Sequence, residues 1–427
     1  MCASRDCNMR TLFISHIVPY PLNGGTRQRV FHLLRALSRI SEVTLVCPTS
    51  HAERTDDVAA LQSLCTETFS YPSRPYGPQW RNSVLRWIEW KLRYLYFPRP
   101  VDLQFTRSRA GANLIRQLRP ERYDLVWVER LEAMQLLPTR LNTRVVVDLD
   151  DIQTEWLAAR LRHEPPSRGK FFEFLEYLKW RQTENGLRKF PYTVAVCSEA
   201  GRELLKCGTR AAVIPNGIDL PGEEEAGRRG GSRPTVLFLG MMAYSANIDV
   251  VVYFVQNIWP KILKDLPSAR FLVVGRDPGL RVQRLHDGNR NIVTGTVGSI
   301  SPYFREATAM VVRLRFGSGT RIKILESWAH RLPVVTTRLG ADGLEAENGK
   351  HLLIADSAED FTRACLRLVQ DRCLRGHLAG EGYAHVRERY TWESVEGKVR
   401  EIARASETRT GRQPPQVVAT RVFGDSA

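Results

Sequence analysis

Short apolar runs rich in β-branched residues alternate with longer amphipathic segments along this chain, and the whole pattern occurs twice. Such alternation predicts parallel strands that are connected by helices. The first set of predicted strands is 11–17, 43–48, 124–129, 145–150, 193–198 and 211–217, with a helix over 26–39. The second set is 235–240, 270–275, 291–297, 309–314, 332–337 and 351–355, with a helix near 247–265. The sequence therefore predicts an α/β protein with two Rossmann-like domains.

The segment 219–234 separates the two sets. It is charged, rich in glycine and without periodicity, which is typical of a linker. We therefore expect an N-terminal domain over 1–218 and a C-terminal domain over 235–406, facing each other across a cleft. The carboxyl ends of parallel strands are where such sheets bind ligands. The remaining segment, 407–427, is polar and is predicted to be disordered.

The composition narrows the class of protein and of partner. A hydrophobic content of 43% with 25% charged residues is that of a soluble globular protein. The net charge of +16 favours an anionic partner: a nucleic acid, an acidic membrane surface or a phosphorylated substrate. Because the chain has neither zinc-finger spacing nor an RNP-like aromatic motif, we expect no nucleic acid among its partners.

Cysteine spacing and hydropathy indicate the compartment. The eight cysteines are scattered without a C-x-x-C pair, as is typical of reduced thiols in a cytoplasmic protein. The N-terminus lacks the apolar run of a signal peptide. No window approaches the length of about 18 uninterrupted apolar residues that a transmembrane helix needs. We expect a cytoplasmic protein, and peripheral contact with the inner face of the membrane remains open.

A glycine-rich loop opens an amphipathic helix in the stretch RLRFGSGTRIKILESWAHRLPVVTT. Gly317 and Gly319 allow the backbone to approach a ligand, and the helix N-terminus offers N–H groups to a phosphate. Arg321 and Lys323 would add positive charge, and the Glu326 carboxylate one turn further could hold ribose hydroxyls. This pattern favours a nucleoside diphosphate site. The alternative is a capped helix with a Lys323–Glu326 surface pair, worth about 0.2–0.5 kcal/mol.

Taken together, several separated motifs resemble the GT-B retaining glycosyltransferases of glycosyltransferase family 4 (group 1). The motifs are SHIVPYPLNGGTRQRVFHLLRAL, VCSEAG, VIPNGID, FLGMMAYSANIDVVVYFVQNIWPKI and GSGTRIKILESWAHRLPVVTT. The resemblance covers about residues 10–400. Within the family, the motifs are most similar to those of sugar transferases linked to exopolysaccharide or exosortase systems. It implies a GT-B fold, a nucleotide-sugar site in the C-terminal domain and an acceptor site in the N-terminal domain.

The resemblance also implies roles for residues of the glycine-rich loop and its helix. Glu326 matches the second glutamate of the family's E-x7-E pattern, which binds the donor ribose. The first glutamate is replaced by Ser318, so the backbone of Gly317, Ser318, Gly319 and Thr320 is expected to contact the sugar and the diphosphate. The Arg/Lys pair that the family often places after the first strand of this domain is absent from Gly240-Met241-Met242. Arg321 and Lys323 are the expected replacements, as catalytic cations at the diphosphate.

Further positions come from the ends of other strands. Gly24 and Gly25 open the first helix, either as donor-binding residues that allow close approach of a phosphate or sugar or as an ordinary tight turn. Asp150 occupies the position of a family histidine near the sugar and is a candidate catalytic residue. The flanking carboxylates also fit helix capping, and the resemblance implies no metal. The resemblance implies that Gly275, Arg276 and Val297 contact the nucleotide base. His16, at the end of the first strand, is either a structural hydrogen-bonding group or faces the cleft.

The segment QWRNSVLRWIEWKLRYLYFPRP has aromatic and aliphatic residues at helical spacing, and its part 79–96 contains four cations and one acid. It predicts a basic amphipathic helix over 79–96 that contacts an anionic membrane. Its cations are Arg81, Arg86, Lys91 and Arg93. The alternative is a helix that packs on the core while its cations reach the solvent.

The resemblance implies transfer of a sugar from a nucleoside diphosphate sugar to a glycan or lipid-linked acceptor, in synthesis of a cell-surface polysaccharide. No cofactor is expected besides the donor substrate. Two alternatives remain at this point: a non-catalytic accessory protein that binds a sugar nucleotide or glycan, and a sugar-nucleotide epimerase or hydrolase on the same fold.

Overall fold

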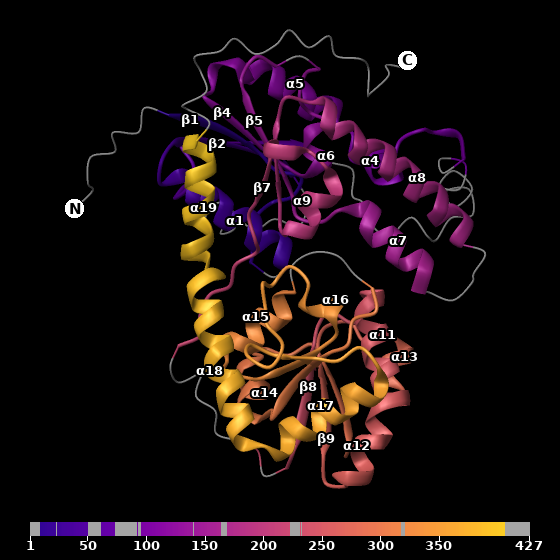
Figure 1. The fold of residues 1–427 in the computed structure, drawn as a ribbon. Coiled ribbons are helices and arrows are strands. Elements are labelled where there is room, and N and C mark those ends of the chain that lie inside the picture. The colour runs from indigo at the N-terminus through magenta and orange to yellow at the C-terminus, as the bar shows by residue number, and fades with distance from the viewer. Residues whose placement is uncertain are drawn as a thin grey trace. The chain divides into compact units, whose positions relative to one another are not determined.

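The chain forms two compact units (Figure 1). The structure, a computed structural model, describes residues 9–22, 24–49, 61–72, 92, 95–139, 141–163, 169–222, 231, 233–316 and 321–405. The first unit runs to Pro215 and resumes at Val395, and the second is Asn216–Ser394. The first unit is therefore discontinuous in sequence. The sequence-based boundaries differ in this respect, because they place 235–406 entirely in the C-terminal domain.

The first unit is built on a seven-stranded sheet in the order β3-β2-β1-β4-β5-β6-β7, and every strand pair in it is parallel. Its strands are β1 Arg10–Ile14, β2 Glu42–Thr49, β3 Glu67–Pro72, β4 Leu125–Glu129, β5 Arg144–Leu149, β6 Thr193–Val196 and β7 Ala211–Val213. The central strands are buried along almost their whole length, as expected for a sheet covered on both faces. The prediction of a parallel α/β domain is confirmed here.

Helices connect these strands. They are α1 Gly25–Ser38, α4 Val101–Phe105, α5 Arg109–Leu118, α6 Arg130–Met134, α7 Gln153–His163, α8 Lys170–Gly186 and α9 Glu199–Leu205, with 3-10 turns at Pro120–Arg122, Leu187–Lys189 and Gly208–Arg210. The predicted helix over 26–39 corresponds to α1. The predicted amphipathic helix over 79–96 lies outside the described residues except for 92, 95 and 96.

The last helix, α19 Trp392–Ala405, carries the chain from the second unit back into the first. Its Glu396 carboxylate is fully buried and accepts a hydrogen bond from Nε of Arg35 at 2.5 Å. Arg39 and Arg400 add ion pairs to the same carboxylate, at 2.6 and 3.8 Å. Because both Arg35 and Arg39 belong to the end of α1, one carboxylate joins the first and last helices of this unit.

The second unit has a six-stranded parallel sheet in the order β10-β9-β8-β11-β12-β13. Its strands are β8 Thr235–Leu239, β9 Arg270–Val274, β10 Asn291–Gly295, β11 Ala309–Val312, β12 Val334–Thr336 and β13 Leu353–Ile354. Its helices are α11 Ser245–Tyr253, α12 Trp259–Asp265, α13 Leu280–Gln283, α14 Ser301–Glu306, α15 Ile322–Ala329, α16 Arg338–Ala341, α17 Ala358–Gln370 and α18 Arg372–Arg389. The second predicted α/β set is thereby confirmed as well.

The predicted helix near 247–265 is interrupted by a π-turn at Phe254–Ile258, between α11 and α12. Pro260 stands at the start of α12 and has no N–H to donate to the preceding turn. The interruption therefore has a local cause in the sequence.

Two further findings concern the described part of the chain. No helix there is long and apolar enough to cross a membrane. Its cysteines are free thiols, and four of them are buried: Cys47, Cys197, Cys207 and Cys365.

Candidate functional site

The carboxyl ends of β8 and β9 meet at two glycines. A Cβ atom on Gly275 would lie 1.7 Å from the carbonyl oxygen of Gly240, so no side chain fits there. A Cβ atom on Gly240 would lie 2.7 Å from Nδ2 of Asn247. The N–H of Met242 donates to the carbonyl of Arg276 at 2.8 Å and fastens the two strand ends together. This edge of the sheet is where parallel α/β folds bind ligands, and its glycines are required by close packing.

Lys323, in the first turn of α15, reaches this edge. Its ammonium group donates a hydrogen bond to Oδ1 of Asn247, whose Nδ2 in turn donates to the carbonyl of Met241 at 2.8 Å. The ammonium nitrogen also lies 4.9 Å from the ring centre of Phe238. Desolvation and the nearby charge of Arg321 lower the pKa of Lys323 to about 7. The group is therefore positioned to gain from an added negative charge.

Glu326 lies on the same helix one turn after Lys323. Among the described residues its carboxylate has neither a hydrogen bond nor an ion pair, and the ammonium group of Lys323 bonds to Asn247 instead. Burial raises the pKa of Glu326 to about 7, against a smaller opposite effect of Lys323. Among the described residues the two groups are therefore not in ion-pair contact, and the alternative of a Lys323–Glu326 surface pair is wrong.

Arg321 precedes α15 and is buried, with Nη2 donating to the carbonyl of Leu339 at 3.2 Å. Gly317, Ser318, Gly319 and Thr320, predicted to contact the donor, lie outside the described residues. Val297, predicted to contact the base, follows the end of β10 and is half-buried.

Two arginines after β11 escaped the sequence-based prediction. Arg313 is buried, and its guanidinium carbon lies 3.8 Å from the ring centre of Tyr253. Arg315 forms a two-pronged ion pair with Asp249, with Nε to Oδ2 at 2.8 Å. Both come directly before the glycine-rich loop, so cations stand on each side of it in sequence. The sequence Arg-Leu-Arg directly after an apolar strand was the signal that could have indicated these two cations.

The N-terminus of α1 contains the other predicted glycine pair. Gly24 is the N-cap and has an extended backbone, and a Cβ atom placed on it would meet nothing within 4 Å. Open space therefore surrounds this position, and Gly25 begins the helix. Protein packing does not require glycine at Gly24, in contrast to Gly275.

Behind this helix lies a buried ion pair between Arg29 and Asp148, both fully buried. Nε and Nη2 of Arg29 donate to the two oxygens of Asp148 at 2.8 and 2.6 Å. Its Nη1 donates to the carbonyl of Ile214 at 2.9 Å. Asp148 is thereby occupied in holding α1 against β5 and the end of β7.

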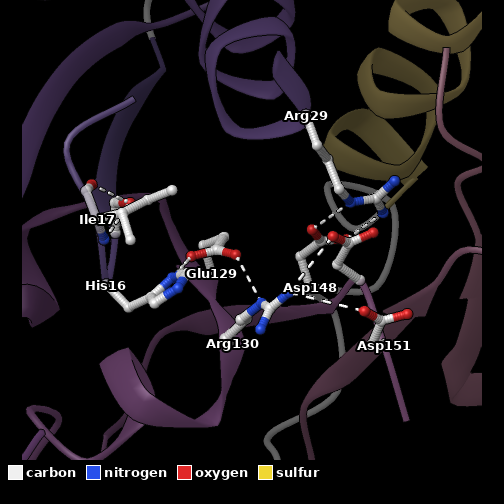
Figure 2. A network of polar contacts seen from close by, with 9 residues as sticks. His16, Ile17, Arg29, Glu129, Arg130, Asp148 and Asp151 are labelled. Carbon is white, nitrogen blue, oxygen red and sulfur yellow. Dashed lines mark hydrogen bonds and ion pairs between the residues drawn. The ribbon is translucent and has the colours of Figure 1, made fainter. Parts of the chain in front are cut away.

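A second polar network occupies the carboxyl ends of β1, β4 and β5 (Figure 2). The fully buried Glu129 binds Nδ1 of His16 through one oxygen, and Nε of Arg130 lies 3.5 Å from the other. Nη2 of Arg130 lies 3.4 Å from Oδ2 of Asp150 and 4.0 Å from Oδ2 of Asp151. The predicted residue Asp150 is thus brought together with His16, at the edge where ligands bind.

Arg130 has an unusual backbone within this network. Its φ of 66° is in the left-handed region that non-glycine residues rarely adopt. Such conformations are kept where surrounding contacts outweigh their cost, often at functional sites. The sequence-based prediction missed Glu129 and Arg130, although their charge at the end of the apolar run DLVWV was a usable signal.

Two Rossmann-like domains, each with a polar site at the carboxyl edge of its parallel sheet, define the GT-B class of glycosyltransferases. Residues 23–221 match the family described as Glycosyltransferase Family 4, and residues 233–371 match Glycosyl transferases group 1. The chain belongs to the group 1 glycosyltransferases of family 4. The resemblance to group 1 glycosyltransferases with a GT-B fold is thereby confirmed.

Solved structures support the same fold. The sucrose-phosphate synthase of Thermosynechococcus elongatus superposes with a TM-score of 0.65 at 16% identity, covering 93% of this chain and 99% of that one. Anabaena HepE, solved in complex with UDP and glucose, has a TM-score of 0.60 at 13% identity, covering 93% and 100%. A 44.6 kDa protein of the Klebsiella pneumoniae cps region is 19% identical over 168 residues, 38% of this chain. That alignment spans 43% of the Klebsiella protein.

Proposed function

We propose that the protein transfers a sugar, with retention at the anomeric carbon, from a nucleoside diphosphate sugar to a glycan or lipid-linked acceptor. The observation that carries this proposal is the pair Lys323 and Glu326, which stand one helical turn apart and are not bonded to each other. A cation for the diphosphate and a carboxylate for the ribose are the two groups that a donor of this class needs. The cps-region relative and the UDP–glucose complex of HepE support the substrate class.

The donor would lie in the second unit. Glu326 accepts hydrogen bonds from the ribose, and Lys323 with Arg321 balances the diphosphate. Gly275 and Arg276 at the end of β9, with Val297 after β10, contact the base. The backbone of Gly317–Thr320 contacts the sugar and the diphosphate. No cofactor besides the donor takes part in this proposal.

The acceptor would lie in the first unit. Gly24, with open space around it, and Gly25 begin the helix whose N-terminus favours an anionic group, and we keep them as donor-binding residues that a phosphate or the reacting sugar approaches. Asp150, held by Arg130, accepts a hydrogen bond from a sugar hydroxyl. Its contact with Arg130 fixes the direction of the carboxylate, which is the requirement for positioning a reacting hydroxyl.

The reaction is best written as a front-face substitution. The bond between the anomeric carbon and the phosphate oxygen breaks, and the acceptor oxygen forms its bond on the same face. The leaving phosphate oxygen takes the acceptor proton, so no protein nucleophile is needed. Lys323 and Arg321 act on the charge that grows on the diphosphate as the bond breaks.

Two measurements test this proposal. In a thermal-shift screen of nucleoside diphosphate sugars, a donor at about 100 times its Kd stabilises the fold by roughly 2.7 kcal/mol. Release of nucleoside diphosphate from that donor is then followed with and without lipid-linked or glycan acceptors. Acceptor-dependent release supports transfer. Acceptor-independent turnover would favour a hydrolase or epimerase, and binding without turnover would favour an accessory protein.

A further inference from the structure

Helix α8 packs into the first unit through one side. Trp180 is only 2% exposed and belongs to the hydrophobic core. Glu176 Oε1 accepts the N–H of Val101 at 2.5 Å, and Glu184 Oε1 accepts that of Gln153 at 2.8 Å. These two N–H groups begin α4 and α7, where a helix has no partners of its own. The core-facing side of α8 is therefore fixed.

The opposite side of α8 carries large apolar side chains that face solvent. Phe171, Phe174 and Leu178 are 58%, 47% and 41% exposed. Their spacing of three and four residues places them on one face of the helix. A surface helix normally directs a single apolar face at the core. A second, exposed apolar face is a feature of interaction surfaces.

Exposed apolar residues continue in the segment that leads into α4. Leu95 and Phe97 are about half exposed, and Tyr96 is 76% exposed. The hydrogen bond between Val101 and Glu176 brings this segment into the fold beside α8, as the positions of α4 and α8 in Figure 1 show. We call the six residues of both segments the α8 surface: Leu95, Tyr96, Phe97, Phe171, Phe174 and Leu178.

The charges of α8 are arranged around this surface. Arg181 lies one turn beyond the apolar residues and is exposed, and Lys170 immediately precedes them. The exposed part of the helix offers no free acid, because Glu173 is paired with Arg160 at 2.8 Å and the two clamping glutamates are buried. The α8 surface therefore combines aromatic and aliphatic groups with positive charge.

We propose that the α8 surface docks the protein onto an anionic lipid bilayer, with α8 lying in the plane of the interface. Phenylalanine and leucine side chains would enter the boundary between headgroups and acyl chains, while Arg181 and Lys170 meet anionic headgroups. The net charge of +16 on the chain adds a general attraction to such a surface. Docking onto a bilayer is independent of the transferase activity, and the vesicle experiments measure binding alone.

A bilayer fits these residues better than a protein partner does. The free charges that border these residues on α8 are of one sign, which suits a continuous anionic surface. Leu95 and Tyr96 are the last two residues of the segment 79–96 for which the sequence predicts membrane contact, and that prediction itself stays untested.

Co-sedimentation of the full chain with vesicles tests the proposal. We expect binding to vesicles of phosphatidylcholine and phosphatidylglycerol in equal parts at low salt, and much weaker binding to phosphatidylcholine alone. The triple variant Phe171→Ser, Phe174→Ser, Leu178→Ser should bind the anionic vesicles at least ~10-fold more weakly, because three apolar side chains no longer insert. Arg181→Glu should weaken binding to the anionic vesicles without affecting the neutral ones.

The matched control replaces exposed apolar residues on other helices, Leu204→Ser on α9 and Leu280→Ser on α13, which are 50% and 70% exposed. These variants should bind as the wild type does. Thermal melting verifies that each variant is folded, and the Arg181→Glu comparison holds even if the triple variant does not fold. The proposal is overturned if the wild type fails to bind anionic vesicles, or if the folded triple variant binds as tightly as the wild type. It is also overturned if the triple substitution abolishes self-association in vesicle-free solution instead.

Discussion

Lys323 donates its hydrogen bond to the side chain of Asn247, although the carboxylate of Glu326 stands only one turn further along the same helix. Asn247 is 76 residues away in sequence and belongs to α11. An amide oxygen neutralises no charge, so Lys323 keeps its full attraction for an incoming anion. The same arrangement leaves the carboxylate of Glu326 open to neutral donors such as hydroxyl groups.

Replacement of Glu326 by alanine should weaken binding of the nucleotide-sugar donor by about 1–3 kcal/mol, the cost of a lost hydrogen bond to a charged group. Isothermal titration calorimetry measures this directly. Glu393→Ala, which removes an exposed carboxylate from the same unit, is the matched control and should leave affinity unchanged. Equal affinities for both folded variants would contradict a ribose contact at Glu326.

The double variant Arg321→Ala, Lys323→Ala should lower kcat by a larger factor than it raises the Kd of the donor. Charge on the diphosphate grows during bond breaking, so cations contribute more in the transition state than in the ground state. Steady-state turnover and calorimetry on the same preparation separate the two effects. Unchanged kcat would mean that other cations, such as Arg313 and Arg315, act on the diphosphate.

The affinity for nucleoside diphosphate should fall as the pH rises above about 7. The pKa of Lys323 in the free protein is lowered to about 7, so the ammonium is charged below that pH and loses its proton above it. A bound anion favours the charged form, and binding above about pH 7 therefore takes up a proton. Calorimetry in two buffers of different ionisation enthalpy measures this uptake.

Lys323→Arg provides the control for this pH dependence, because a guanidinium stays charged throughout the range. Its proton uptake above about pH 7 should vanish while binding persists. Uptake that is the same in Lys323→Arg as in the wild type would assign the titration to another group.

Arg29→Ala should lower the free energy of unfolding by about 3–5 kcal/mol, because it leaves the carboxylate of Asp148 buried without its partner. Urea denaturation followed by circular dichroism measures the loss. Arg109→Ala, at an exposed arginine of the same unit, should stay within about 0.5 kcal/mol of the wild type. Similar values for both variants would show that Asp148 adapts by protonation or by taking up water.

The free energy of unfolding of Arg130→Gly should exceed that of Arg130→Ala by about 1 kcal/mol. Both substitutions remove the ion pairs of Arg130, but only alanine retains the cost of the left-handed backbone. In the middle of α8 the order should reverse, with Arg181→Ala more stable than Arg181→Gly. Finding alanine favoured at both positions would mean that the backbone at Arg130 relaxes once its side chain is gone.

Much of the fold was predictable because buried parallel strands are apolar throughout. The strand β3 was missed because it lacks that apolar run. It lies at the edge of the sheet, its sequence ETFSYP mixes polar and apolar residues, and most of it is exposed. The donor-site helix was predictable from its local glycine and charge pattern. The partners of its charges were not, since Asn247 and Phe238 meet Lys323 only through tertiary packing. The alternative of a lysine–glutamate pair was the natural local inference, and long-range contacts decided against it.

The path of α19 has a consequence for how the protein is made. The carboxylate of Glu396 balances Arg35 and Arg39 at the end of α1, yet it is translated after the whole of Asn216–Ser394. On the ribosome the domain that begins first is therefore finished last. Until α19 arrives, the nascent chain lacks the carboxylate that balances Arg35 and Arg39 and the apolar residues Val395 and Val399 that are buried in the finished fold, and incompletely packed states of this kind are prone to aggregate. The second domain, being continuous, can fold while the first still waits for its closing helix.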